Sequence, residues 1–195
     1  MEPYEEKEHR GYTCKVYYDS NPESPAEWDT LGTIYTNTRR YNPQNHTIEE
    51  IMVEGKDGQK FISADYIYVR IYAYEHGGIT LSSSRTVQQC GWDDYLFGVM
   101  AVHRDDAIKE FGRLTIAENY ESVLKCLEAE VKEWDQYFRG EVFGYEVTKD
   151  GEFIDSCWGF YGDAEMVMQE GIDIINYYAD NAERREKIVE PFWID

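Results

Sequence analysis

Apolar residues between positions 120 and 138 recur at intervals of three and four, which is the spacing of one face of an α-helix. They are Tyr120, Val123, Leu124, Leu127, Val131, Trp134 and Phe138. Thr115 and Glu118 form a capping-box pattern ahead of this run, and Gly140 follows its end. We therefore expect a long amphipathic helix over residues 115–139, with its apolar face packed against another layer of structure.

The residues before this helix favour β-strands. The clearest run, residues 66–74, carries a β-branched or aromatic side chain at nearly every position, so we expect both faces of this strand to be at least partly buried. A short helix from Asp105 or Asp106 to Phe111 is also indicated. Shorter strands are predicted at residues 13–18, 31–36, 79–81 and 97–102.

The residues after the long helix predict a hairpin and a second helix. Lys149-Asp150-Gly151 is a turn signal between the β-rich residues 142–147 and 153–158. Asp163 is a candidate N-cap for a helix over residues 163–182. This order of elements predicts an α+β fold, in which an antiparallel or mixed sheet carries helices mainly on one face.

The domain organisation follows from length and from the first residues. Residues 1–10 contain several acidic side chains and little to bury, so we expect a mobile acidic arm. Residues 11–195 are expected to form a single α+β domain, with an alternative of two lobes that meet near residues 103–115.

The charge balance limits the classes of partner. The chain has 39 Asp and Glu against 19 Lys and Arg, a formal net charge of −20, and 15% aromatic residues that indicate a packed core. Such a surface repels nucleic acid and anionic membranes and attracts basic proteins. We therefore expect a basic protein surface as the partner, with no direct binding to nucleic acid or membrane.

Two predicted helix faces concentrate carboxylates. Residues three and four apart on a helix have Cβ atoms about 5–6 Å apart, which is comparable with the spacing of DNA phosphates. This suggests imitation of nucleic acid, and the alternative is a solvated face that keeps the protein soluble. The candidate partner-binding residues are Glu118, Glu121, Glu128, Glu130, Glu133 and Asp135 on the first helix and Asp163, Glu165, Glu170, Asp173 and Asp180 on the second.

No pattern predicts catalysis or a cofactor. Neither a dinucleotide-binding glycine motif nor a phosphate-binding loop occurs. Cys157 lies in a Ser-Cys-Trp sequence similar to that around the nucleophile of papain-like proteases, but all four histidines precede it. We interpret Cys157 as a small buried thiol. The carboxylates are too numerous for any pair to be selected as general acid and base.

Two alternative functions stay open. Tyr74, His76, Asp93 and Asp94 could form the site of a small enzyme or ligand-binding module. The candidate metal ligands are His76, Cys90, Asp93, Asp94 and His103, although their spacing matches no closed zinc site. The other alternative is a virion-associated or self-assembling protein, with Tyr and Trp at subunit contacts. A homodimer is compatible with either alternative.

The compartment is inferred from the cysteines and the first residues. Four widely spaced cysteines include no Cys-x-x-Cys, and the chain opens without an apolar signal segment. No run approaches the roughly 20 apolar residues of a membrane span. We expect a cytoplasmic protein with reduced thiols.

Five blocks of the sequence together carry a family resemblance. They are Asp29-Thr30-Leu31-Gly32-Thr33, Arg39-Arg40-Tyr41-Asn42, His76-Gly77-Gly78-Ile79-Thr80, residues 134–145 (WDQYFRGEVFGY) and residues 155–162 (DSCWGFYG). These blocks resemble an uncharacterised family associated with bacteriophages, plasmids and other mobile elements. The family has Asp-His-Ser-Gly where this chain has Glu75-His76-Gly77-Gly78, and Cys-Pro-Trp-Asp-Ser-Gly where it has Cys90-Gly91-Trp92-Asp93-Asp94-Tyr95, which argues against a strict catalytic site there.

The resemblance implies a biological setting and no established activity. Small acidic proteins of mobile elements resemble inhibitors of host defence, such as anti-restriction or anti-CRISPR proteins, which occupy basic nucleic-acid channels. The expectation is therefore a non-enzymatic accessory protein that acts in the cytoplasm of a host bacterium on a nuclease or another nucleic-acid-binding defence protein.

Overall fold

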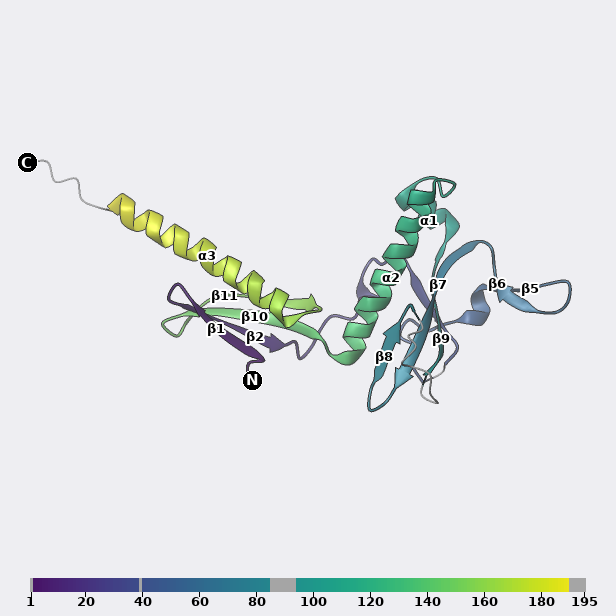
Figure 1. Cartoon of the computed structure of the whole chain (residues 1–195), viewed down its shortest axis with the longest axis horizontal. Coiled ribbons are helices and arrows are strands. Elements are labelled where there is room, and N and C mark those ends of the chain that lie inside the picture. Colours follow the sequence, from purple (N-terminus) through teal and green to yellow (C-terminus); the bar gives the residue numbers. More distant parts are fainter. Residues whose placement is uncertain (1, 39, 85–93, 190–195) are drawn as a thin grey trace, which may run out of the picture. The chain divides into compact units, whose positions relative to one another are not determined.

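The computed structural model describes residues 2–38, 40–84 and 94–189 and divides the chain into two compact units (Figure 1). The terminal unit joins the residues up to Glu23 with those from Gly140 onward, and the central unit runs from Ser24 to Arg139. Three α-helices and eleven strands lie in the described residues, and the expected α+β class is confirmed. The chain passes from one unit to the other after Glu23 and after Arg139. Neither point is near residues 103–115, where two lobes were the expected alternative.

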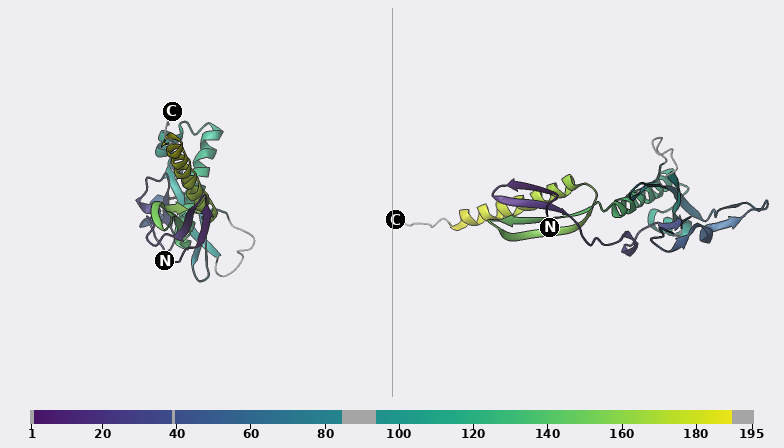
Figure 2. Two further views of the ribbon diagram at one scale, coloured as in Figure 1. Left: turned by 90° about the vertical axis from the view of Figure 1, so that its left-hand side faces the viewer. Right: turned by 90° about the horizontal axis from the view of Figure 1, so that it is seen from below.

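The terminal unit is a four-stranded antiparallel sheet with one helix (Figures 1 and 2). Its strand order is β1-β2-β10-β11, and helix α3 lies along one face. Two-residue turns at Arg10-Gly11 and Asp150-Gly151 have positive φ at both positions, as tight hairpins require, so the predicted hairpin is confirmed. The elements are β1 (Glu5–His9), β2 (Tyr12–Tyr18), β10 (Val142–Lys149), β11 (Glu152–Tyr161) and α3 (Ala164–Val189).

Strand β1 lies where a mobile arm was expected. It pairs with β2 from Glu5 opposite Val16 to His9 opposite Tyr12. His9 Nε2 forms a 2.8 Å hydrogen bond with Asn176 Oδ1 of α3, which ties the end of β1 to the helix. The acidic residues do not prevent pairing because edge strands commonly carry charged side chains toward solvent.

The core of the terminal unit lies between α3 and the sheet. Val167 and Ile175 of α3 are fully buried, as are Cys14, Val16 and Val147 of the sheet. The helix comes very close to the sheet at Gly171, where an added Cβ would lie 2.3 Å from Cys14 Sγ. Glycine therefore permits this close approach, because a Cβ at position 171 would meet the Cys14 sulfur unless the helix or the Cys14 side chain moved.

The central unit is a five-stranded mixed sheet in the order β4-β3-β9-β7-β8. Among its described strands, only β3 and β4 pair in parallel. Helix α2 packs on one face, and the other face is covered in part by a short 3₁₀ helix and a two-stranded ribbon. The elements are η1 (Pro25–Glu27), β3 (Thr33–Thr36), β4 (His46–Thr47), η2 (Ile48–Ile51), β5 (Met52–Glu54), β6 (Lys60–Ile62), β7 (Tyr66–Glu75), β8 (Ile79–Ser82), β9 (Asp94–His103), α1 (Arg104–Phe111) and α2 (Ala117–Arg139).

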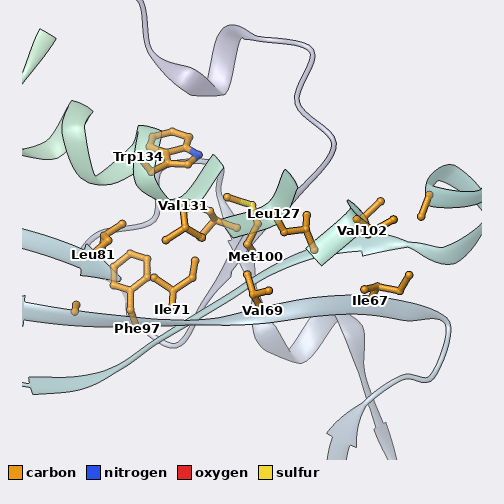
Figure 3. Close-up of a cluster of buried hydrophobic side chains, with 14 of the residues drawn as sticks. Ile67, Val69, Ile71, Leu81, Phe97, Met100, Val102, Leu127, Val131 and Trp134 are labelled. Atoms are coloured by element: carbon orange, nitrogen blue, oxygen red, sulfur yellow. The ribbon is translucent and has the colours of Figure 1, made fainter. Parts of the chain in front are cut away.

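The core of the central unit joins α2 to β7 and β9 (Figure 3). Leu127, Val131 and Trp134 of the helix contact the apolar face of the sheet, which includes Ile71 and Phe97. The periodic apolar residues of the predicted helix therefore form its buried face. Its first residue is Ala117, so the helix begins slightly after the predicted cap at Thr115.

Strand β7 is buried mainly on one face. Ile67, Val69 and Ile71 are buried under α2, whereas Tyr68 is 38% exposed and Arg70 is also exposed. The expectation that both faces are at least partly buried is therefore wrong in the middle of the strand. The reason is that η2 and the β5–β6 ribbon cover the second face only near Tyr66.

Candidate acidic interaction surface

Glu130 is a structural residue of α2 and does not belong to an exposed acidic face. It is 8% exposed, and its two carboxylate oxygens accept hydrogen bonds from the backbone N–H groups of Leu31 at 2.6 Å and Gly32 at 2.8 Å. Burial raises the pKa of Glu130, and the two N–H donors oppose this shift. Glu130 was expected to be a partner-binding carboxylate, and this expectation is wrong because its oxygens already accept hydrogen bonds from buried backbone donors.

Asp135 has a similar structural role at a sheet edge. It is 8% exposed and accepts a 2.7 Å hydrogen bond from the backbone N–H of Leu81 in β8. Strand β8 pairs only with β7 among the described residues, so this N–H points away from its strand partner. Asp135 also pairs with Arg139 at 3.4 Å. It caps an edge strand and is unavailable to a partner.

The remaining face of α2 has a nearly balanced charge. Glu118, Glu121 and Glu128 are exposed, but the exposed Lys125 and Lys132 lie among them. Glu133 is half-buried, and burial raises the pKa of its carboxyl group. The α2 face therefore offers little net negative charge to a partner.

Helix α3 exposes all of its predicted carboxylates. Asp163, Glu165, Glu170, Asp173 and Asp180 all face solvent, and no Lys or Arg occurs between residues 164 and 183. Asp163 caps the helix, since the Glu165 N–H donates to its Oδ1 at 2.9 Å, as predicted. The absence of interspersed lysines distinguishes this face from that of α2.

One end of α3 is neutralised by Arg10 from the β1–β2 turn. Its guanidinium forms salt bridges with Asp180 at 2.7 Å and with Glu183 at 2.6 Å. Glu165, Glu170 and Asp173 make no salt bridge with a described residue, although Gln169 donates a 2.9 Å hydrogen bond to Asp173. The unneutralised charge therefore lies on the first half of the helix.

Two exposed apolar side chains lie among these carboxylates. Met166 is 47% exposed and Tyr177 is 63% exposed. We call the row Asp163, Met166, Glu170, Asp173 and Tyr177 the α3 stripe. Its members are spaced three and four residues apart, so they follow one side of the helix, opposite the buried Ile175. Sequence reasoning missed Met166 and Tyr177, although the same spacing could have identified them.

The charge is unequally divided between the two units. The terminal unit has 20 acidic and 7 basic residues, a formal charge of −13, within 79 residues. The central unit has 19 acidic and 12 basic residues, a formal charge of −7, within 116 residues. The strongest negative potential is therefore expected around the terminal unit, which carries the α3 stripe.

The alternative site at residues 74–95 is described only in part. Tyr74 and His76 stack with ring centroids 6.2 Å apart. Cys90 and Asp93 lie outside the described residues, as does the side chain of Asp94. No group of three or more potential metal ligands occurs in the part of the chain that the structure describes.

Glu75 beside this region is held by two contacts. Tyr95 Oη donates to it at 2.5 Å, and Arg40 Nη1 donates at 3.0 Å. Burial and this bond to a carboxylate raise the pKa of Tyr95. Both contacts use the Glu75 carboxylate to join separate segments of the central unit, which is a structural role.

Two of the described thiols, Cys14 and Cys126, have raised pKa values. Cys14 is buried, and burial raises its pKa to about 11. Cys126 is half-buried in a groove of about 560 Å³ with Asp29, Asp106 and Glu110, and burial with nearby carboxylates raises its pKa. Cys157 is exposed on β11, so the expectation of a buried thiol is wrong there. A raised pKa disfavours the reactive thiolate.

Comparisons with known proteins identify no relative. No family model, no curated protein and no solved structure matches the chain. In the described part of the chain, no helix has the length and apolar character to cross a membrane.

Proposed function

We propose that this protein is a non-enzymatic binding protein whose α3 stripe docks on a basic protein surface. The observation that supports this most directly is a row of exposed carboxylates without interspersed cations, beside Met166 and Tyr177. The partner class is a nuclease or another nucleic-acid-binding defence protein of a host bacterium. The protein would then act as a phage or mobile-element inhibitor that occupies a nucleic-acid channel.

The mixture of residue types on the stripe supports a protein partner. Met and aromatic residues are enriched in protein interfaces, and tyrosine is frequent among the residues that contribute most to binding. The surrounding carboxylates would steer association with a basic surface and make it sensitive to salt. Solubility alone requires charge and does not require exposed apolar side chains among the charges.

The test compares two charge-reversed variants as baits. Glu170→Lys with Asp173→Lys changes the α3 stripe, and Glu121→Lys with Glu128→Lys makes the same change in charge on α2. Wild type and the α2 variant should capture a nucleic-acid-binding protein from bacterial lysate at 50 mM salt. The α3 variant should bind it about tenfold more weakly, as expected for a loss of about 1.4 kcal/mol.

The captured protein is then purified and assayed for DNA binding or cleavage with increasing amounts of wild type. Inhibition that weakens between about 50 and 200 mM salt supports the proposal. Equal capture by the two variants, capture indifferent to salt, or a captured protein whose DNA binding is unaffected would each contradict it.

A further inference from the structure

Within the described residues, the first half of β7 has a strand partner on one side only. On one side β9 pairs with β7 from Tyr66 to Tyr74. On the other side β8 reaches only Tyr72–Glu75, and Figure 1 shows β8 beside one end of β7. From Tyr66 to Ile71, no strand of the described residues pairs with that second side.

The register identifies the unpaired backbone groups. The N–H of Arg104 donates to the carbonyl of Asp65 at 2.8 Å, so Asp65 directs its backbone groups toward β9. Because this direction alternates along an antiparallel strand, Tyr66, Tyr68 and Arg70 direct theirs toward the free edge. Among the described residues, only the N–H of Tyr66 has a backbone partner there, the carbonyl of Ser63 at 3.1 Å.

A groove of about 520 Å³ adjoins this edge and carries positive charge. Its lining includes Ser63, Tyr66, Tyr68, Arg70, Arg104 and Tyr120. Arg104 Nε donates to the carbonyl of Ala64 at 2.6 Å, which fixes this guanidinium near the start of β7. Neither arginine of the groove forms a salt bridge within the described residues, although the whole chain has a formal charge of −20.

The outer edge of β8 and the unpaired part of β7 differ in whether a side chain bonds to their backbone groups. Asp135 closes the outer edge of β8 by accepting the Leu81 N–H. Strand β8 ends at Ser82, where a turn forms as Ser84 N–H donates to Ser82 Oγ at 3.2 Å and Ser82 Oγ donates to the Ser84 carbonyl. No described side chain bonds to the free backbone groups of Tyr68 or Arg70, so this part of β7 can accept another strand.

We propose that this edge binds an extended acidic peptide segment of a partner protein by β-strand addition. The unpaired backbone groups of β7 give the main-chain hydrogen bonds, and the two arginines select carboxylates. Residues four apart on a strand share one face and are about 13 Å apart. A segment with two acidic residues at that spacing would place one near Arg104 and the other near Arg70. This site is formed by other residues than the α3 stripe. It binds an acidic partner, whereas the stripe binds a basic one.

The test uses a fluorescein-labelled peptide, Thr-Glu-Val-Thr-Val-Glu-Thr, and the whole protein. Fluorescence anisotropy is measured in 0.15 M salt, where the Debye length of about 8 Å screens the overall negative charge. Saturable binding is expected. Replacing both Glu with Gln should weaken it about tenfold, and N-methylation of the three central residues should abolish it by removing N–H donors from the peptide.

The matched protein variants are Tyr68→Pro and Tyr68→Ala. Proline removes the outward N–H and is tolerated on a strand edge, whereas alanine removes the ring and keeps the N–H. Tyr68→Pro should bind the peptide at least about tenfold more weakly than Tyr68→Ala, a loss of about 1.4 kcal/mol. Thermal unfolding verifies that both fold. If Tyr68→Pro is unfolded, the N-methylated peptide on wild type decides the question.

Three results would overturn the proposal. The first is that the acidic peptide shows no saturable binding to wild type. The second is that the N-methylated peptide binds wild type as tightly as the unmodified peptide does. The third is that folded Tyr68→Pro and Tyr68→Ala bind the peptide with equal affinity. If the Gln peptide binds as tightly as the Glu peptide, strand addition is still supported. The role given to Arg70 and Arg104, and with it the proposed preference for acidic segments, would then be wrong.

Discussion

At the scale of single residues, burial separates carboxylates that look alike in the sequence. Glu128 and Glu130 lie two positions apart on α2, and only Glu130 accepts the N–H groups of Leu31 and Gly32. A buried backbone donor without an acceptor is costly, so the function of Glu130 is to hold a distant loop against the helix. Glu128 stays in solvent.

Removal of the Glu130 carboxylate should destabilise the central unit. Glu130→Ala leaves two backbone N–H groups without their acceptor. Each costs about 1–3 kcal/mol if no water takes the place of the carboxylate. The matched Glu128→Ala should leave the free energy of unfolding nearly unchanged. Denaturant unfolding of both variants measures the difference, and equal stability would show that the Leu31–Gly32 loop does not depend on Glu130.

The raised pKa of Glu130 predicts the sign of a pH effect. Its ordinary pKa is 4.5, and the folded value lies higher, so folding favours the protonated form. The stability contributed by this group is greatest below 4.5 and decreases as pH rises through the folded pKa. The stability of wild type relative to Glu130→Gln should therefore fall between pH 4 and 7. A relative stability that rises with pH would contradict this.

At the scale of elements, the position of α3 depends on close packing at Gly171. An added Cβ would meet Cys14 Sγ at 2.3 Å, within the layer that joins α3 to β2. Helices usually gain stability when Ala replaces Gly, by about 1 kcal/mol. Here the contact with Cys14 opposes that gain, so the helix sequence alone gives the wrong sign.

Gly171→Ala should destabilise the terminal unit by about 1–3 kcal/mol, the usual cost of overpacking a core. Cys14→Ala removes the contacted sulfur, so the double variant should be more stable than the sum of the two single effects predicts. A double-mutant cycle by thermal unfolding measures this coupling. Additive effects would mean that the helix shifts instead of meeting Cys14.

At the scale of the whole molecule, the terminal unit is built from the two ends of the chain. Strands β2 and β10 pair from Phe143 opposite Tyr18, and Asp19 N–H donates to the carbonyl of Val142 at 2.8 Å. The central unit is therefore inserted between adjacent strands of another sheet. Each unit has its own hydrophobic core.

The two units should fold separately. Residues 24–139 form one fragment, and the other joins residues 1–23 to 140–195 through a flexible linker of about five residues, a length common between strands. Circular dichroism and thermal unfolding should show a cooperative transition for each, with helix and strand content preserved. Absence of a transition in either fragment would show that this unit depends on the other.

The sequence determined the elements that depend on neighbouring residues. Periodic apolar residues predicted α2, Asp163 predicted the start of α3, and Asp150-Gly151 predicted a hairpin, because helix faces, caps and tight turns are local. The overall class followed from their order. Strand β1 was missed because its charged residues have no local signal for pairing.

Only the tertiary structure decided which strands pair and which carboxylates face solvent. Val142 joins Asp19 and Glu130 joins Gly32 across about a hundred residues or more, and no local pattern encodes such contacts. For the same reason, the sequence predicted an acidic surface on both α2 and α3, and the structure leaves one on α3. Burial removes Glu130 and Asp135, lysines offset much of the charge that remains on α2, and α3 keeps its exposed acidic stripe.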